Sequence, residues 1–400
     1  MNLYIYTVKY PSHGEFFINY ELPKASLLFD NVFIVSTKNC NVAQGDFDLL
    51  KRKFLNVHYL GCANWTSKVN FSLFSLAEIH GECKKIIGVR GFLKCIYRVY
   101  KSLKLNSYIR AIDDLNAFHY SYWGNASALA LCDPSIKRKL CRFHGSDLYN
   151  NNPKTGYNYF QRKIVSELYT FCISNHGAMY LQRLHGDHVK GITVSYLGVP
   201  SRINSMELQP RKFNDLYAVK VVSLIIIASL DHNKRVLEIL VALSKVSSVR
   251  PKVTVVGDGP EFSKIQNFVS GIDLKVDLHG AVEHRVVKDM LSKNNYDFIV
   301  NFSKSEGIPV SLMEAMSFGV VPIAPLVGGI GELVCEKTGF LVNPSSDSAQ
   351  LAEQFHDIFA SEPELLASKS KGSIDLVSKR FNLSHNIDAF FNLMVKRVYE

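Results

Sequence analysis

The chain has 400 residues, 47% of them hydrophobic, and carries a formal net charge of +10. This length predicts two or three domains, and the apolar fraction is ample for their cores. The longest apolar stretch, residues 219–230, falls short of the roughly 18 residues that a membrane-spanning helix needs, so we expect no such helix. The positive charge either serves solubility or attracts an anionic partner. Nucleic acid is the weaker candidate because no zinc-finger or RNA-binding signature is found, which leaves an anionic lipid surface or a lipid diphosphate.

The cysteines and the first residues predict where the protein acts. Eight cysteines are spread along the chain without a Cys-x2-Cys pair. In a chain of this size they are expected to be reduced, mostly buried thiols, which favours the cytoplasm. Residues 1–6 lack the pattern of a signal peptide and are expected to form a strand.

Strands and helices are predicted to alternate through the first domain, residues 1–199. Expected strands cover residues 1–8, 32–36, 140–143 and 172–175. A helix is expected from Glu15, and Pro23 should end or kink it. Gly14, just before this helix, would let the backbone approach a phosphate closely.

Residues 68–110 form the most basic region of the chain. Lys94, Arg98 and Lys101 share one helical face by their spacing. The apolar residues of another face are Leu93, Ile96, Tyr97 and Tyr100. Such a basic amphipathic helix either packs on the core with an ordinary solvated face or docks on an anionic membrane leaflet.

Three further residues of the first domain, Tyr122, Trp123 and His144, are candidates for binding a sugar. Tyr122 and Trp123 could stack on an acceptor sugar, although aromatic side chains more often belong to the core. His144 follows the strand at 140–143, and ligands of open α/β sheets bind at the carboxyl ends of strands. It could therefore hydrogen-bond a sugar hydroxyl or a phosphate, or it could be structural.

A polar, proline-containing linker, residues 201–215, precedes the second domain, residues 216–380. The near-continuous apolar run at 220–228 is typical of a central parallel strand. Lys234 follows it, just ahead of a predicted helix, and is well placed to bind a diphosphate.

The strongest functional signal lies at residues 303–319. A loop rich in serine leads from a buried strand into a helix predicted over residues 310–318. Pro309 suits the first turn of this helix, and Gly319 suits a left-handed cap at its end.

Two glutamates and a helix start are brought together by this stretch. The N–H groups around Val310 lie at the positive end of the helix dipole, which suits a phosphate. Glu306 and Glu314 would accept hydrogen bonds from sugar hydroxyls. The alternative is a solvated helix with two surface glutamates.

Glu306 and Glu314, separated by seven residues, resemble the Glu-x7-Glu motif of the retaining glycosyltransferases of family 4, which have the GT-B fold. The following residues resemble the same family in the same order: Gly319, Pro322, Gly328, Gly329, Glu332 and Gly339. Gly14-Glu15, Tyr122-Trp123 and residues 144–149 look most like members that build bacterial surface polysaccharides.

The resemblance implies an α/β architecture of two Rossmann-like doubly wound domains facing across a cleft, with a helix at 381–400 packed on the first domain. It implies Glu306, His144 and Lys234 as catalytic residues. The implied donor-binding residues are Gly14, Ser229, Arg235, Gly257, Val282, Gly307, Ile308, Pro309, Val310 and Glu314, and the implied acceptor-binding residues are Glu15, Tyr122 and Trp123. Ser229 stands where the family carries an arginine, so either Arg235 substitutes for it, or the alignment slips, or one phosphate contact is missing.

The function implied by the resemblance is transfer of a sugar, with retained configuration and without metal or cofactor. The donor would be a nucleotide diphosphate sugar, such as UDP-GalNAc or UDP-Gal, and the acceptor a lipid-diphosphate-linked saccharide of O-antigen or capsule synthesis. The enzyme would be peripheral to the inner face of the cytoplasmic membrane. The alternatives are a nucleotide-sugar hydrolase or epimerase, a non-catalytic binding subunit, and a nucleic-acid-binding protein.

Overall fold

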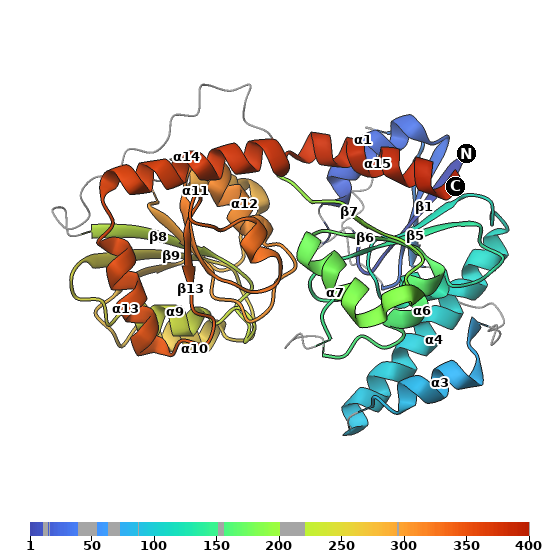
Figure 1. The fold of residues 1–400 in the computed structure, drawn as a ribbon, viewed down its shortest axis with the longest axis horizontal. Coiled ribbons are helices and arrows are strands. Elements are labelled where there is room, and N and C mark those ends of the chain that lie inside the picture. Colours follow the sequence, from blue (N-terminus) through green and yellow to red (C-terminus); the bar gives the residue numbers. More distant parts are fainter. Residues whose placement is uncertain are drawn as a thin grey trace. The chain divides into compact units, whose positions relative to one another are not determined.

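The computed structural model describes residues 1–10, 15, 17–38, 54–62, 73–86, 88–150, 156–200, 221–293 and 296–399. The chain divides into two compact units. Unit 1 contains Met1–Asn151, Thr155–Ser195 and His385–Glu400, and unit 2 contains Tyr196–Ser384. Each unit is built on a parallel sheet of its own (Figure 1).

Unit 1 has a seven-stranded sheet in the order β3-β2-β1-β4-β5-β6-β7. Its strands are β1 (Asn2–Thr7), β2 (Asn31–Ser36), β3 (Val57–Cys62), β4 (Phe118–Ser121), β5 (Arg138–Phe143), β6 (Tyr169–Cys172) and β7 (Ile192–Val194). All neighbouring strands are parallel. The strand order reverses between β1 and β4, which is where open α/β sheets bind ligands.

Helices cover both faces of this sheet. They are α1 (Ile18–Leu28), α3 (Leu76–Cys83), α4 (Gly88–Ile112), α5 (Ala126–Ala130), α6 (Gln161–Glu167), α7 (Asn175–His185), the short 3₁₀ helix η3 (Gly186–His188) and α15 (Leu383–Tyr399). Leu105 and Ile109 of α4 belong to one core cluster, while Phe390 and Phe391 of α15 pack in the other with β1 and β4.

The first helix differs from the prediction. It begins at Ile18 rather than at Glu15 and continues past Pro23 to Leu28, so Pro23 does not end it. A proline in the interior of a helix removes one intrahelical hydrogen bond, and its ring crowds the carbonyl group four residues earlier. Burial of Ile18, Leu22 and Ala25 against the core offsets that loss.

Unit 2 has a six-stranded parallel sheet in the order β10-β9-β8-β11-β12-β13. Its strands are β8 (Val221–Ile227), β9 (Arg250–Val256), β10 (Lys275–Leu278), β11 (Phe298–Val300), β12 (Val321–Pro325) and β13 (Phe340–Val342). In chain order this is the 3-2-1-4-5-6 arrangement of a doubly wound nucleotide-binding sheet. The order reverses between β8 and β11.

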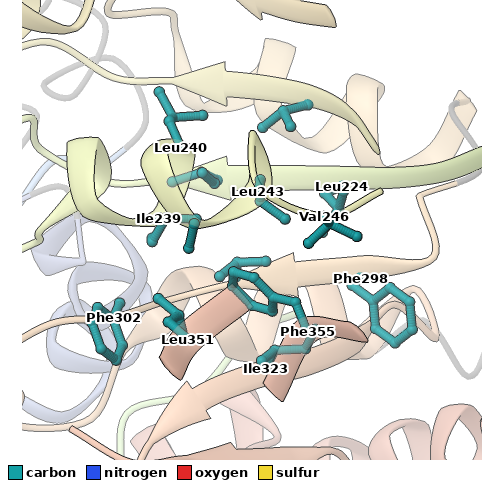
Figure 2. Close-up of a cluster of buried hydrophobic side chains, with 14 of the residues drawn as sticks. Leu224, Ile239, Leu240, Leu243, Val246, Phe298, Phe302, Ile323, Leu351 and Phe355 are labelled. Carbon is teal, nitrogen blue, oxygen red and sulfur yellow. The ribbon is translucent and has the colours of Figure 1, made fainter. Parts of the chain in front are cut away.

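The helices of unit 2 are α9 (Val236–Leu243), α10 (Phe262–Val269), α11 (His284–Lys293), α12 (Val310–Ser317), the 3₁₀ helix η4 (Gly328–Glu332), α13 (Ser348–Phe359) and α14 (Pro363–Arg380). Figure 2 shows Ile239, Leu240 and Leu243 of α9 meeting side chains of the sheet and of α13 in one buried cluster. This core holds the loops after β8 and β11 on a rigid base.

Candidate active site

The loops that follow β8 and β11 are joined directly at the reversal point of the unit 2 sheet. The backbone N–H of Lys304 donates to the carbonyl of Asn233 at 2.8 Å. The side-chain amide of Asn233 donates to the carbonyl of Ser305 at 3.0 Å. Because both loops leave the carboxyl ends of central parallel strands, these bonds place Lys234 beside Glu306.

Lys234 and Glu306 form an ion pair at this junction. The Nζ atom of Lys234 lies 2.5 Å from Oε1 of Glu306, and the amide of Asn301 donates to the same oxygen at 3.3 Å. The side chains are 21% and 11% exposed, so solvent reaches both. The structure therefore brings together two of the three residues predicted to be catalytic, as a cation and an anion that a polar ligand could separate.

Two glycines fix the backbone at Glu306 and Gly307. The N–H of Gly329 donates to the carbonyl of Gly307 at 2.9 Å. Gly328 has a φ of +54°, and a Cβ atom there would lie 1.8 Å from the carbonyl oxygen of Glu306. A side chain at position 328 would displace this loop, so the glycine follows from the close approach of the two backbones.

The helix α12 begins where the sequence predicts, with Pro309 as its N-cap and Val310 as its first residue. Ile308 is buried under this start. The first α-helical hydrogen bond runs from Met313 N to Pro309 O, so the amides of residues 310–312 have no acceptor within the helix. Gly319 has a φ of +74°, which confirms the predicted left-handed cap.

Three other predicted donor-binding residues lie at neighbouring strand ends. Ser229 is exposed after β8, and its hydroxyl donates to Asp231 at 3.0 Å. Gly257 follows β9 and has a φ of +144°, and a Cβ atom there would lie 1.8 Å from the carbonyl oxygen of Ala228. Val282 is half-buried between β10 and α11.

Arg235 stabilises a different loop of the unit. Its guanidinium donates to the carbonyls of Pro344 at 2.7 Å and Ser346 at 3.3 Å, and pairs with Glu238 at 2.5 Å. Its Cζ atom stacks 3.9 Å from the ring centre of Phe302. These contacts use its three nitrogens on protein groups; its role as a phosphate contact stays a prediction.

His144 lies at the end of β5 in unit 1, as expected. Its ring is packed 4.3 Å from Trp123 and 4.9 Å from Tyr122, measured between ring centres. Both ring nitrogens are buried and lack a hydrogen-bond partner among the described residues. Burial lowers the pKa of His144 well below its ordinary value, and the nearby Arg142 lowers it further, so the ring is neutral at physiological pH. A neutral ring with two unused nitrogens is suited to hydrogen-bonding a hydroxyl group.

Asp147 shapes the backbone around His144. Its two carboxylate oxygens accept from the N–H of His144 at 2.7 Å and from the N–H of Gly124 at 2.6 Å. Burial raises the pKa of Asp147 to about 6 despite these hydrogen bonds. The sequence contained this residue in the stretch 144–149 but did not indicate this bridging role.

The predicted acceptor-binding residues lie at the β1–β4 reversal point of unit 1. Glu15 is buried and accepts from the N–H groups of Val8 at 2.9 Å and Lys9 at 2.8 Å. The indole of Trp123 donates to Glu15 at 2.5 Å. Tyr122 is only 1% exposed and is part of the unit 1 core. Gly14 lies outside the described residues.

The second part of the chain matches a known family. The family model described as "Glycosyl transferases group 1" matches residues 214–373, the part of the chain that contains the Lys234–Glu306 pair. The chain carries a group 1 glycosyltransferase domain. The putative colanic acid biosynthesis glycosyltransferase WcaL of Escherichia coli K12 is 30% identical over 145 residues, which cover 34% of this chain and 36% of WcaL. The chain spans about a third of the length of the curated relatives it matches.

Solved structures resemble the whole chain. Sucrose-phosphate synthase from Thermosynechococcus elongatus has a TM-score of 0.71 at 15% identity, with 99% of both chains covered. HepE of Anabaena in complex with UDP and glucose has a TM-score of 0.65 at 16% identity, with 99% of this chain and 100% of HepE covered. The predicted fold class, two Rossmann-like domains of the GT-B type, is confirmed.

One neighbour within the group 1 domain was missed by the sequence analysis. The ring Nε2 of His284 hydrogen-bonds Oε1 of Glu314, and Glu314 is buried while His284 is partly exposed. His284 is the first residue of α11, and 30 residues separate it from Glu314. Local spacing cannot reveal a contact between residues this far apart in the chain.

The described residues were searched for metal sites and for membrane-spanning helices. They contain no group of three or more His, Cys, Asp or Glu side chains that could hold a metal ion. Within the same part of the chain, no helix combines the length and apolar character needed to span a bilayer.

Proposed function

We propose that this protein is a retaining glycosyltransferase that moves a sugar from a nucleotide diphosphate sugar to a lipid-diphosphate-linked saccharide. The observation that carries the proposal is the Lys234–Glu306 ion pair, which joins the loop after β8 to the loop that leads into α12 of the group 1 domain. An ammonium group and the free amides of a helix start are both suited to an anionic leaving group.

Charge builds on the β-phosphate as the donor loses its sugar. Lys234 would stabilise that charge, and the amides of residues 310–312 would add hydrogen bonds to it. Glu306 would then exchange its bond with Lys234 for bonds to hydroxyls of the transferred sugar. Glu314 would bind the ribose hydroxyls, with His284 setting the orientation of its carboxylate.

The bonding changes are those of a front-face substitution. The acceptor hydroxyl oxygen forms a bond to the anomeric carbon on the face that the diphosphate leaves. The electron pair of the broken C–O bond goes to the departing nucleoside diphosphate, whose β-phosphate oxygen takes the acceptor proton. The anomeric configuration is thereby retained, and the step requires no metal or cofactor.

Two of the similar proteins support the choice of substrates. WcaL is described as a glycosyltransferase of colanic acid biosynthesis, which supports surface-polysaccharide assembly. HepE was solved with UDP, which favours a uridine donor such as UDP-Gal or UDP-GalNAc. Trp123, which is partly exposed, would face the acceptor and is held in place by its contacts with Glu15 and Tyr122, and His144 would face the donor sugar or phosphate. A lipid-linked acceptor would place the reaction at the inner face of the cytoplasmic membrane.

Alanine substitutions of the ion pair test the proposal. Lys234→Ala and Glu306→Ala should each lower kcat by about 10²–10³, as loss of one charge-stabilising group does. Sugar transfer would be measured with a panel of UDP- and GDP-sugars and a lipid-linked saccharide. Lys245→Ala and Glu353→Ala remove an exposed cation and an exposed anion of unit 2 and should leave kcat unchanged.

Near-wild-type turnover in both ion-pair variants would overturn the assignment. Rapid consumption of the donor without any acceptor would instead indicate the hydrolase or epimerase alternative. Circular dichroism of each variant separates loss of chemistry from loss of fold.

A further inference from the structure

Helix α4 has an unusual charge composition. Its 25 residues, Gly88–Ile112, contain no aspartate or glutamate. The basic residues of the helix are Arg90, Lys94, Arg98, Lys101, Lys104 and Arg110. A long cationic helix is suited to an anionic surface rather than to a neutral or cationic one.

An apolar stripe runs along the solvent-exposed side of this helix. We call it the α4 stripe, and it consists of Val89, Phe92, Leu93, Ile96, Tyr97 and Tyr100. Residues 89, 93, 96 and 100 are spaced by three or four positions, and Phe92 and Tyr97 lie next to them in the sequence. All six side chains therefore share one broad face of the helix. Their exposed fractions range from 48% to 76%.

The exposure of the stripe shows that its apolar side chains do not pack on the core of unit 1. The apolar residues of this helix were expected either to pack on the core or to face a membrane. Core packing is instead provided by a different face, which includes Cys95, Leu103, Leu105 and Ile109. The stripe is therefore additional apolar surface that the fold of unit 1 does not use.

Cationic groups lie beside the stripe. The Nζ atom of Lys101 is 4.9 Å from the ring centre of Tyr97, and that of Lys104 is 4.7 Å from the ring centre of Tyr100. The acidic side chains of the neighbouring helix α3 are already paired, Glu78 with Lys163 and Glu82 with Lys85. Figure 1 shows α3 and the first half of α4 standing away from the sheet of unit 1.

We propose that the α4 stripe docks in the interface of an anionic lipid bilayer, with the helix lying in the membrane plane. The aliphatic members and Phe92 would enter the boundary of the acyl chains, and Tyr97 and Tyr100 would lie at the level of the headgroups. Arg90, Lys94, Lys101 and Lys104 would bind the anionic headgroups.

The composition of the stripe selects the bilayer over other anionic partners. A nucleic acid would be held by cations and by flat rings on which bases stack. Val89, Leu93 and Ile96 offer no such ring, and their burial is favoured in hydrocarbon. The proposal goes beyond the proposed reaction, because it depends on α4 and not on the donor site.

Vesicle co-sedimentation of the full chain, without nucleotide, tests the proposal. Binding to vesicles that contain phosphatidylglycerol should exceed binding to pure phosphatidylcholine and should weaken with salt. The variant Arg90→Glu with Lys94→Glu should lower the affinity for the anionic vesicles at least about tenfold. The matched control, Lys245→Glu with Lys264→Glu, makes the same change in net charge in unit 2 and should bind like wild type.

A second pair of variants tests the apolar part. Phe92→Ser with Ile96→Ser should also lower the affinity, by about tenfold. Leu27→Ser with Leu365→Ser, which changes two exposed leucines elsewhere, should not. Equal vesicle binding by wild type and both stripe variants would overturn the proposal, as would self-association of the wild type that the stripe variants abolish. Donor turnover measured without vesicles should be unchanged in these variants, so failure of the proposed reaction would be seen separately.

Discussion

Asp147 is a buried carboxyl group whose ionisation works against the folded state. Burial raises its pKa to about 6, whereas an unfolded aspartate titrates near about 3.9. Between these values the folded chain binds more protons than the unfolded chain, so the free energy of unfolding falls as the pH rises. This carboxyl should therefore lower the free energy of unfolding by up to about 3 kcal/mol between pH of about 4 and about 6.5.

Asp147→Asn should remove that pH-dependent part, although it also weakens one of the two backbone hydrogen bonds at every pH. The measurement is urea unfolding followed by tryptophan fluorescence, since the chain has two tryptophans and both precede unit 2 in the sequence, with Trp123 packed against His144 in unit 1. Asp187→Asn removes an exposed carboxyl from the same unit and should keep the wild-type pH dependence. An equal pH dependence in wild type and Asp147→Asn would contradict this explanation.

At the scale of single residues, the sequence predicted candidates but not their partners. Glu306 and Lys234 were each recognised from their own loops, and the ion pair between them exists because β8 and β11 are neighbours in the sheet. The contact of His284 with Glu314 depends on the same kind of long-range packing. Side-chain chemistry can thus be predicted locally, while the geometry of the site needs the topology.

Among the elements, α14 is fixed by polar contacts on its buried face. The hydroxyl groups of Ser370 and Ser373 each donate at 2.7 Å, to the carbonyls of Gly319 and Thr338. Gly372 lies between them, and a Cβ atom there would be 2.1 Å from the carbonyl oxygen of Lys337. The helix cannot move away from this carbonyl without breaking both hydrogen bonds.

Two glycine substitutions in helices should therefore have opposite signs. Gly372→Ala should lower the free energy of unfolding by about 1–3 kcal/mol because the added methyl group is overpacked. Gly81→Ala in α3 should raise it by about 0.5–1 kcal/mol, because no described atom outside its own helix and chain neighbours lies within 4 Å. Urea unfolding followed by circular dichroism compares them, and a stabilised Gly372→Ala would refute the packing argument.

Elements were predicted well where a single local rule applied. The start of α12 at Val310 and its cap at Gly319 followed from proline and glycine preferences. Pro23 was expected to end or kink α1, and it does not end the helix because tertiary burial outweighs that local rule. For α4, periodicity identified an apolar face but could not tell whether the fold buries it.

At the scale of the whole molecule, the C-terminal helix α15 packs in the same hydrophobic core as the first strand and helix of the chain. Phe391 of α15 is fully buried in one cluster with Leu3 and Phe29, and its ring centre is 6.4 Å from that of Phe29. Phe390 packs 5.0 Å from Phe171 and 3.9 Å from the guanidinium of Arg142. Sequence periodicity predicts such a helix, whereas the surface that it covers was implied only by the family resemblance.

Phe391→Ala should consequently destabilise unit 1, although position 391 follows the whole of the group 1 domain in the chain. Removal of a buried phenyl ring leaves a cavity and costs about 3–5 kcal/mol. Tryptophan fluorescence reports unit 1, so its unfolding midpoint in urea should fall. Leu341→Ala truncates a partly exposed side chain of unit 2 and should leave that midpoint unchanged. A Phe391→Ala midpoint equal to that of wild type would mean that unit 1 is stable without the packing of α15.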